Sequence, residues 1–264
     1  RRCKGTVMML GLALKEKLRR GEAVIGCFVG VPSPELVEML GWLGFDFVVI
    51  DAEHGHITPQ SAYWMVVAAE GSGLCPLVRI PTIDESVIQT YLDLGAAGLF
   101  VPRVETVEDL RRLEKAAFYH PLGERGLGHV RAGRYGYRQP VKVFAHQANE
   151  ALVLVAQVET QRAIEQLEVL VTDPLIDALF IGATDLAQSL GYPGEAHHPN
   201  VRAAIEAIVQ NVGPRKPLGT SAREPRAIAE AVTRGFRLIL ANVHAIVRAG
   251  ATQYLEAFAA AKGT

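Results

Sequence analysis

Apolar segments of strand length alternate with longer segments of helical period along most of the chain, and this alternation constrains the fold more than any other feature. Most of the apolar segments are continuous runs of Val, Ile, Leu and Phe, as in parallel strands that helices cover. Repeated βα units of this kind predict an α/β protein, a single (β/α)8 TIM barrel. The eight expected strands are residues 23–30, 45–51, 76–80, 97–102, 152–159, 176–182, 216–220 and 236–241.

The chain length supports one barrel rather than two domains. At 264 residues it exceeds a usual single core but matches the common size of an eight-stranded α/β barrel. We expect residues 11–264 to form the barrel domain and residues 1–10 to be an N-terminal extension. Helix starts are predicted at Ser33-Pro34, Thr58-Pro59, Asp84, Thr106, Asp185 and Glu224-Pro225, and C-terminal caps at Gly44, Gly95 and Gly235.

Composition excludes several classes of partner. The net charge of −1 leaves no basic face for a nucleic acid, and no apolar run approaches the roughly 20 residues of a membrane span. Cys3, Cys27 and Cys75 are odd in number and widely spaced, which fits neither a disulfide framework nor a thiolate metal site. We therefore expect a cytoplasmic protein that acts on small molecules, with no nucleic-acid or membrane partner.

Polar residues close four of the predicted strands. In a barrel the carboxyl ends of the strands meet at one face, where active sites form. Gln157 and Glu159 lie two apart on one strand and so project to the same face, which we expect to be the inside. The four segments are Ile50-Asp51-Ala52-Glu53-His54, Val78-Arg79, Gln157-Val158-Glu159-Thr160 and Gly182-Ala183-Thr184-Asp185.

Two of these acids predict a metal site. Glu159 and Asp185 offer hard oxygen ligands at neighbouring strand ends, a set that suits Mg²⁺ or Mn²⁺ better than a structural Zn²⁺. Each residue also has a simpler interpretation. Glu159 and Asp185 would serve as helix caps or surface acids, Arg79 as an ion-pair partner of Asp51 or Glu53, and His54 as a loop histidine. The joint occurrence of the two acids favours a metal.

These segments resemble the HpcH/HpaI family of class II, metal-dependent pyruvate aldolases, such as 4-hydroxy-2-oxoheptanedioate aldolase and 2-dehydro-3-deoxyglucarate aldolase. The resemblance runs from about Gly26 to near the C-terminus and also rests on Val101-Pro102 and Gly123-Glu124-Arg125-Gly126. It implies a barrel of the phosphoenolpyruvate/pyruvate-domain type. The implied reaction is reversible cleavage of 4-hydroxy-2-oxo acids to pyruvate and an aldehyde through a metal-stabilised enolate. The implied assembly is a homohexamer that exchanges its last helix between subunits.

The resemblance also implies roles for individual residues. Glu159 and Asp185 would bind the divalent ion, Mg²⁺ or Mn²⁺ with Co²⁺ as a third candidate, and Gln157 would lie beside the pyruvate. Arg79 would face the keto or enolate oxygen and so act in both binding and catalysis. The catalytic proton acceptor would be His54, oriented by Asp51. The substrate carboxylate would be held by backbone amides of Gly182, Ala183 and Thr184.

Several segments depart from the family pattern or leave alternatives open. Relatives commonly have Gly-Pro-Ala-Asp at 182–185, a more apolar turn at 219–223 and a Gly/Asp-containing end at 240–244, so the aldehyde remains open. The Gly-rich stretch 123–128 follows a helix rather than a strand, which argues against dinucleotide binding. Two alternatives stay open for the loop residues Arg131, Arg134, Tyr135, Tyr137 and Arg138: recognition of the aldehyde tail, or subunit contacts.

Two other functions remain possible from the sequence. The first is oxaloacetate decarboxylation, or another metal-enolate reaction at a carbon–carbon bond on the same barrel. The second is a non-catalytic barrel that binds a 2-oxo acid as a sensor, which the altered residues Thr184 and Asn242 suggest. The intact set Asp51, His54, Arg79, Glu159 and Asp185 argues against the sensor.

Overall fold

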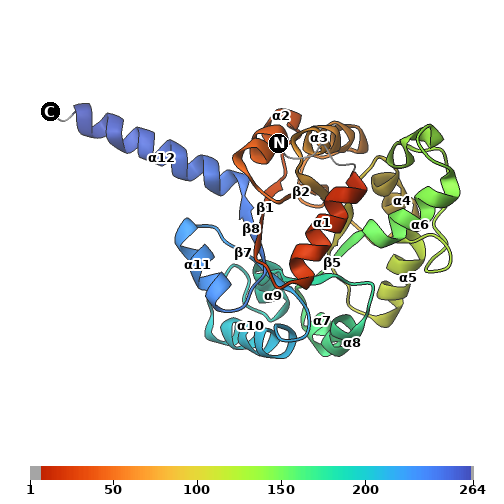
Figure 1. The fold of residues 1–264 in the computed structure, drawn as a ribbon. Helices are drawn as coiled ribbons and strands as arrows, with labels where there is room; N and C mark the ends of the chain where they lie inside the picture. Colours follow the sequence, from red (N-terminus) through yellow and green to blue (C-terminus); the bar gives the residue numbers. More distant parts are fainter. Residues whose placement is uncertain (1–6, 263–264) are drawn as a thin grey trace.

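The computed structural model describes residues 7–262 and contains a closed barrel of eight parallel strands, each paired with its neighbours in chain order (Figure 1). All eight predicted strands are confirmed, with ends that differ by no more than two residues. The strands are β1 (Val24–Val29), β2 (Phe47–Asp51), β3 (Cys75–Arg79), β4 (Gly98–Val101), β5 (Val153–Val158), β6 (Ala178–Ile181), β7 (Leu218–Ser221) and β8 (Leu238–Asn242).

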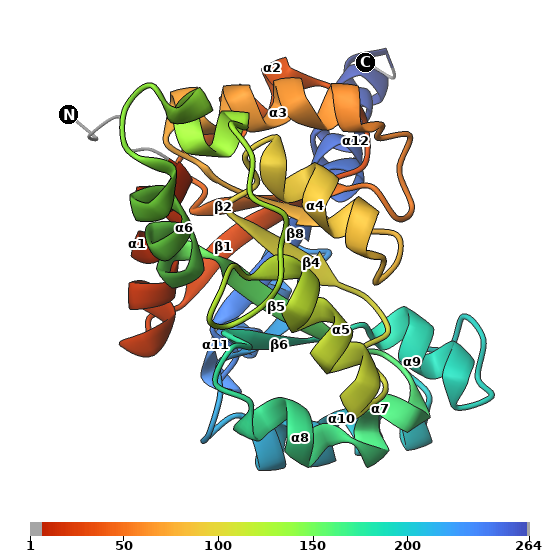
Figure 2. The same ribbon diagram turned by 90° about the vertical axis from the view of Figure 1, so that its right-hand side faces the viewer.

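Helices surround the barrel in both views (Figure 1, Figure 2). The side chains of Ser33, Thr58, Asp84 and Thr106 accept hydrogen bonds from first-turn N–H groups, as predicted for caps. The prediction for Asp185 was wrong, because its helix begins two residues earlier. The helices are α2 (Pro34–Leu43), α3 (Pro59–Ser72), α4 (Glu85–Asp93), α5 (Val107–Ala117), α6 (Val141–Ala151), α7 (Gln161–Glu165), α8 (Leu167–Thr172), α9 (Ala183–Ser189), α10 (Pro199–Val212) and α11 (Pro225–Thr233).

One more helix, α1 (Val7–Arg19), packs against the end of the barrel where the strands begin. Its Lys15 is buried, donates a 2.9 Å hydrogen bond to the Leu152 carbonyl and lies 3.2 Å from an Asp177 oxygen. Residues 7–10 of the expected extension therefore belong to a packed helix, and residues 1–6 lie outside the described part. The opposite end of the barrel is left for the site.

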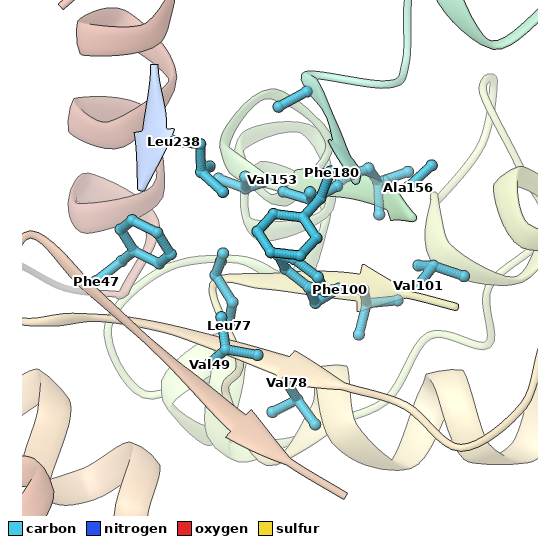
Figure 3. Packing of buried hydrophobic residues seen from close by; sticks show 14 of the residues in the cluster. Phe47, Val49, Leu77, Val78, Phe100, Val101, Val153, Ala156, Phe180 and Leu238 are labelled. Carbon is cyan, nitrogen blue, oxygen red and sulfur yellow. The ribbon is translucent and has the colours of Figure 1, made fainter. Parts of the chain in front are cut away.

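Aromatic rings fill the barrel interior (Figure 3). Phe100 and Phe180 meet edge to face with ring centroids 4.9 Å apart, and Phe28 lies 5.4 Å from Phe100. Gly219 on β7 makes room for this group, since a Cβ atom there would lie 2.7 Å from the Phe180 ring. The interior is thus a packed core rather than a pore, and Phe28 and Phe180 form an apolar floor beneath the site.

The segment between α5 and α6 lies outside the barrel. It contains the short 3₁₀ helix η1 (Arg131–Gly136). Arg131 and Arg134 both form ion pairs with Glu70 of α3, and Arg131 also donates to the Leu94 carbonyl. None of residues 120–139 lines the cavity of its own chain. The contacts of Arg131 and Arg134 hold the loop against α3 and the end of α4, and both alternatives for it, recognition of the aldehyde tail and subunit contacts, stay predictions.

The last helix, α12 (Val243–Lys262), continues directly from β8 and projects away from the barrel (Figure 1). Among its described residues Val243 alone is buried, while Ile246, Val247, Tyr254, Leu255 and Phe258 are exposed. A helix with so many exposed apolar side chains normally packs against something. No helix within residues 7–262 is both long enough and apolar enough to cross a membrane.

Candidate active site

A cavity of about 580 Å³ opens at the carboxyl ends of the strands. It lies between the apolar floor and a polar rim formed by the segments that follow β2, β6, β7 and β8. The size is sufficient for a small organic substrate. Of the residues predicted from the sequence, the cavity is lined by Asp51, His54, Arg79, Gln157, Gly182, Ala183, Thr184 and Asp185.

Arg79, the last residue of β3, is held in a two-pronged ion pair. Its Nε and Nη2 atoms donate to the two carboxylate oxygens of Asp51 at 2.9 and 2.6 Å. Its Nη1 lies 3.3 Å from Glu53 Oε2 and 3.5 Å from Gln157 Oε1. Burial opposes ionisation of Asp51, but the guanidinium outweighs it and holds the pKa of Asp51 below its usual value. Arg79 is thus both an ion-pair partner and a cavity residue.

Asp51 orients His54 through the backbone rather than through the ring. Asp51 Oδ1 accepts the N–H groups of His54 at 3.1 Å and Glu53 at 3.2 Å, which fixes the turn after β2. The His54 side chain is 61% exposed, and its Nε2 lies 3.8 Å from Glu53 Oε2. Asp51 therefore contacts the backbone of His54, and the imidazole lies near the carboxylate of Glu53. An exposed imidazole at the cavity wall is free to exchange protons with a bound molecule.

Gln157 and Glu159 project to the same side, as the strand spacing predicts. Glu159 is 3% exposed, and Gln157 Nε2 donates to its Oε2. The second oxygen accepts the backbone N–H of Arg103 at 2.9 Å, and Arg103 adopts a left-handed conformation with φ of 52°. Thr160, not Glu159, caps α7. These contacts exclude both simpler interpretations of Glu159, the surface acid and the helix cap.

Gly182 allows β6 to approach Glu159 closely. A Cβ atom at position 182 would lie 2.8 Å from Glu159 Oε2, so a larger residue would displace the carboxylate. Asp185 follows in the first turn of α9 and lines the cavity, while Gly182 rather than Asp185 is the N-cap. Burial, aided by the charges of Glu53 and Asp185, raises the pKa of Glu159 to about 7.

The carboxylate oxygens around Glu159 are ligands that fit a divalent cation. Three carboxylates, Glu53, Glu159 and Asp185, repel one another electrostatically, and Glu53 Oε2 is buried without a hydrogen-bond partner. Burial also raises the pKa of Glu53. Within residues 7–262 no group of three His, Cys, Asp or Glu forms a complete metal cage. A hard cation bound by two carboxylates would relieve the repulsion and retain positions for water and substrate.

Sequence reasoning missed three contributions to this site. Glu53 lies within a segment that was singled out, but its partners became apparent from the fold. Arg103 contributes a backbone N–H, for which side-chain type gives no signal. The outer cavity wall includes Arg248 of α12, six residues beyond the end of the last strand.

Comparison with known proteins places these features in a family. Residues 24–240 match the model described as HpcH/HpaI aldolase/citrate lyase. The 2-keto-3-deoxy-L-rhamnonate aldolase of Salmonella schwarzengrund (strain CVM19633) is 34% identical over 238 residues, which cover 89% of this chain and 88% of that protein.

Solved structures agree. An HpcH/HpaI aldolase/citrate lyase family protein from Burkholderia cenocepacia J2315 has a TM-score of 0.87 at 29% identity, covering 93% of this chain and 98% of its own. Citrate synthase SbnG has a TM-score of 0.83 at 29% identity, covering 96% and 99%. The chain belongs to the HpcH/HpaI aldolase/citrate lyase family and is a carbon–carbon lyase.

Proposed function

We propose that this enzyme is a class II aldolase that reversibly cleaves 4-hydroxy-2-oxo acids into pyruvate and an aldehyde. The observation that carries the proposal is that Arg79 and Asp185 line a substrate-sized cavity, while Glu159 is buried close enough to Asp185 for that charge to raise its pKa. Cleavage of the C3–C4 bond leaves an electron pair on the pyruvate fragment as an enolate, which needs positive charge beside it.

A divalent ion, Mg²⁺ or Mn²⁺ with Co²⁺ as a third candidate, held by Glu159 and Asp185 would supply Lewis-acid stabilisation of that charge. Arg79 would donate from Nη1 to the keto oxygen of the substrate in exchange for its longer contacts with Glu53 and Gln157, because Nε and Nη2 are occupied by Asp51. Gln157 would position the pyruvate fragment from the barrel wall. Of the backbone amides expected to hold its carboxylate, Gly182 N–H already donates to the Val158 carbonyl at 3.2 Å, so those of Ala183 and Thr184 at the start of α9 would hold it.

His54 would carry the proton. In cleavage its imidazole accepts the proton of the C4 hydroxyl while the aldehyde carbonyl forms. In the reverse reaction, aldol addition to the aldehyde, the imidazolium returns the proton to that oxygen. The exposed ring at the cavity wall and the turn fixed by Asp51 support this role. Glu53 Oε2 lies 3.8 Å from His54 Nε2, on the side of the ring that would carry the proton.

Replacement of His54 by alanine tests the proton transfer. We expect His54→Ala to lower the rate of aldol cleavage by roughly 10²- to 10⁴-fold, the usual contribution of a general acid or base, and to leave Mn²⁺ binding unchanged. His146→Ala is the matched control, since His146 is an exposed histidine of α6 outside the cavity. Steady-state cleavage rates measure the effect, and an unchanged rate in His54→Ala would remove this residue from the mechanism.

The likeness to citrate synthase SbnG favours one rival within the same barrel, another carbon–carbon bond reaction such as oxaloacetate decarboxylation. Exchange of pyruvate methyl protons in D₂O, followed by NMR with and without Mg²⁺ or Mn²⁺, tests enolate formation without a known aldehyde. Metal-dependent exchange supports the enolate chemistry, and an aldehyde screen then separates aldolase from decarboxylase. Absence of exchange, together with absence of turnover, would favour the non-catalytic sensor.

We also propose that α12 is exchanged between subunits of a homohexamer. Its Tyr254, Leu255 and Phe258 are exposed, with Tyr254 at 83%, and Trp42 and Leu43 of α2 are exposed on the barrel. Burial of such side chains between copies would contribute roughly 1.5–3 kcal/mol for each large residue.

The assembly can be tested on α12 itself. We expect the double variant Leu255→Asp/Phe258→Asp to lower the molar mass measured by light scattering, because two buried carboxylates would oppose the contact. Gln253→Asp adds a charge at an exposed polar position of the same helix and serves as the control. A native protein that is already monomeric would contradict the proposal.

A further inference from the structure

The cavity is divided by charge into an inner and an outer part. The inner part contains the acids Asp51 and Asp185 together with Arg79, whose charge is balanced by Asp51. The outer part, defined by Ser221, Arg223, Asn242, His244 and Arg248, contains two arginines and a histidine but no acid. We propose that Arg223 and Arg248 bind an anionic group on the tail of the aldehyde, so that the enzyme selects a carboxylated or phosphorylated aldehyde. This inference rests on the proposed aldolase function.

The two arginines have no carboxylate partner in the described part of the chain. The Arg223 side chain makes one hydrogen bond, from Nη2 to Thr184 Oγ1 at 3.3 Å, and Arg248 makes none. Two exposed arginines outside the cavity are paired, Arg215 with Glu168 and Arg234 with Glu206, whereas Arg202 of α10, like the two cavity arginines, has no carboxylate partner among the described residues. The guanidinium groups at the cavity therefore remain available to an anion from solution.

Arg223 marks the boundary between the two parts of the cavity. Its partner Thr184 directly precedes Asp185 on α9, so the guanidinium is anchored next to the proposed reacting end. A substrate that reacts beside Asp185 and extends outward passes Arg223 first. The contact also links β6 to β7, whose ends otherwise share no side-chain hydrogen bond among the described residues. Thr184 thus positions the specificity group as well as lining the site.

Arg248 reaches the outer part because the start of α12 is fixed. Asn242 Oδ1 accepts the backbone N–H of His244 at 2.8 Å, which caps the helix as it leaves β8. His244 and Arg248 are four residues apart and therefore lie on one face of the helix. Both line the cavity. The outer part of the cavity is thus lined by this face of α12 together with Arg223.

The expected preference follows from the chemistry of guanidinium groups. An anionic tail gains charge-assisted hydrogen bonds that a neutral tail of the same length cannot form, worth roughly 10- to 100-fold in kcat/KM for each arginine. Hydroxyl groups on a neutral tail would form hydrogen bonds with Ser221 and Asn242. The charges of Arg223 and Arg248 would then have no anion beside them. The charge pattern therefore favours an anion over a polyol.

The test compares aldehydes of different charge in aldol addition with pyruvate. Succinic semialdehyde carries a carboxylate, glyceraldehyde 3-phosphate a phosphate, and butyraldehyde and glyceraldehyde are neutral. We expect the native enzyme to prefer at least one anionic aldehyde by more than about 10-fold, and the two anions identify which group it binds. Arg223→Gln and Arg248→Gln should each remove roughly 10- to 100-fold of kcat/KM for that aldehyde and change the neutral ones by less than about threefold.

Two controls separate this inference from the proposed function. Arg202→Gln alters an exposed arginine of α10 outside the cavity and should change nothing. Metal-dependent exchange of the pyruvate methyl protons should persist in both cavity variants, because the pyruvate end does not involve them. Loss of exchange in these variants would show that the arginines bind pyruvate itself and would overturn the inference. An equal preference for neutral aldehydes in the native enzyme would overturn it as well.

The anion subsite can be tested even if the protein has no aldolase activity. If the native protein shows no exchange, calorimetric titration with succinate and with inorganic phosphate still tests the anion subsite. Binding that is lost in Arg223→Gln and Arg248→Gln but kept in Arg202→Gln would support the subsite without the aldolase. If neither succinate nor phosphate binds, both the anion subsite and the aldolase function are rejected.

Discussion

Asp185→Asn and Glu159→Gln are each expected to weaken Mn²⁺ binding by more than about 10²-fold, beyond the 10- to 100-fold typical of groups outside the ligand shell. Each variant removes one of two anionic ligands while preserving side-chain size, so the metal loses charge and the cavity keeps its shape. Cleavage of a 4-hydroxy-2-oxo acid should fall by at least about 10³-fold at a fixed low metal concentration. Calorimetric titration and steady-state rates measure the two effects.

The control is Glu195→Gln, which changes an exposed acid far from the cavity lining. Native-like Mn²⁺ affinity in both Asp185→Asn and Glu159→Gln would refute the proposed metal site. If only one of the two variants loses Mn²⁺ affinity, the residue changed in that variant is a metal ligand and the other residue is not.

The pH dependence of metal binding gives an independent check on Glu159. Burial and the nearby charges of Glu53 and Asp185 raise its pKa to about 7, so the carboxyl holds a proton over much of the range below neutrality. A metal must displace that proton. Mn²⁺ affinity should therefore decrease as the pH falls below about 7, with proton release on binding near neutrality. Titrations in buffers of different ionisation enthalpy measure the released proton.

Arg79→Lys is expected to lower kcat for cleavage by roughly 10²- to 10³-fold, the usual loss when one donor to a developing oxyanion is removed. Lysine keeps the positive charge but cannot hold Asp51 with two donors and reach the substrate with a third. The KM for the 2-oxo acid should change less than kcat, because the charge develops in the transition state. Metal-dependent methyl exchange of pyruvate should fall in parallel.

A purely structural role for Arg79 predicts a different pattern. Removal of one partner of a buried ion pair costs roughly 3–5 kcal/mol of stability, so Arg79→Met should unfold more readily than the native protein. Asp51→Asn breaks the same pair while retaining Arg79, and serves as the comparison. If Arg79→Lys kept its methyl exchange while its unfolding midpoint fell to that of Asp51→Asn, Arg79 would be structural alone.

Much of the fold was predictable because local patterns and global architecture agree. Continuous apolar runs such as residues 47–50 and 153–156 can be buried on both faces only in a covered parallel sheet. Ser33 and Thr58 cap their helices through contacts within three residues, which the sequence shows directly. Asp185 failed as a cap because its helix begins at Ala183, a choice that depends on how β6 packs against Glu159.

The barrel, the polar strand ends and the residues that meet there could be predicted from the amino-acid pattern, because eight parallel strands bring their carboxyl ends together whatever the loops do. The tertiary structure decided which partners those residues have. Asp51 binds Arg79 and the His54 backbone, and Arg103 offers an N–H to Glu159. The Asp51–Arg79 and Arg103–Glu159 contacts join residues distant along the chain, and the backbone donors of His54 and Arg103 carry no side-chain signature, so register and packing establish these contacts.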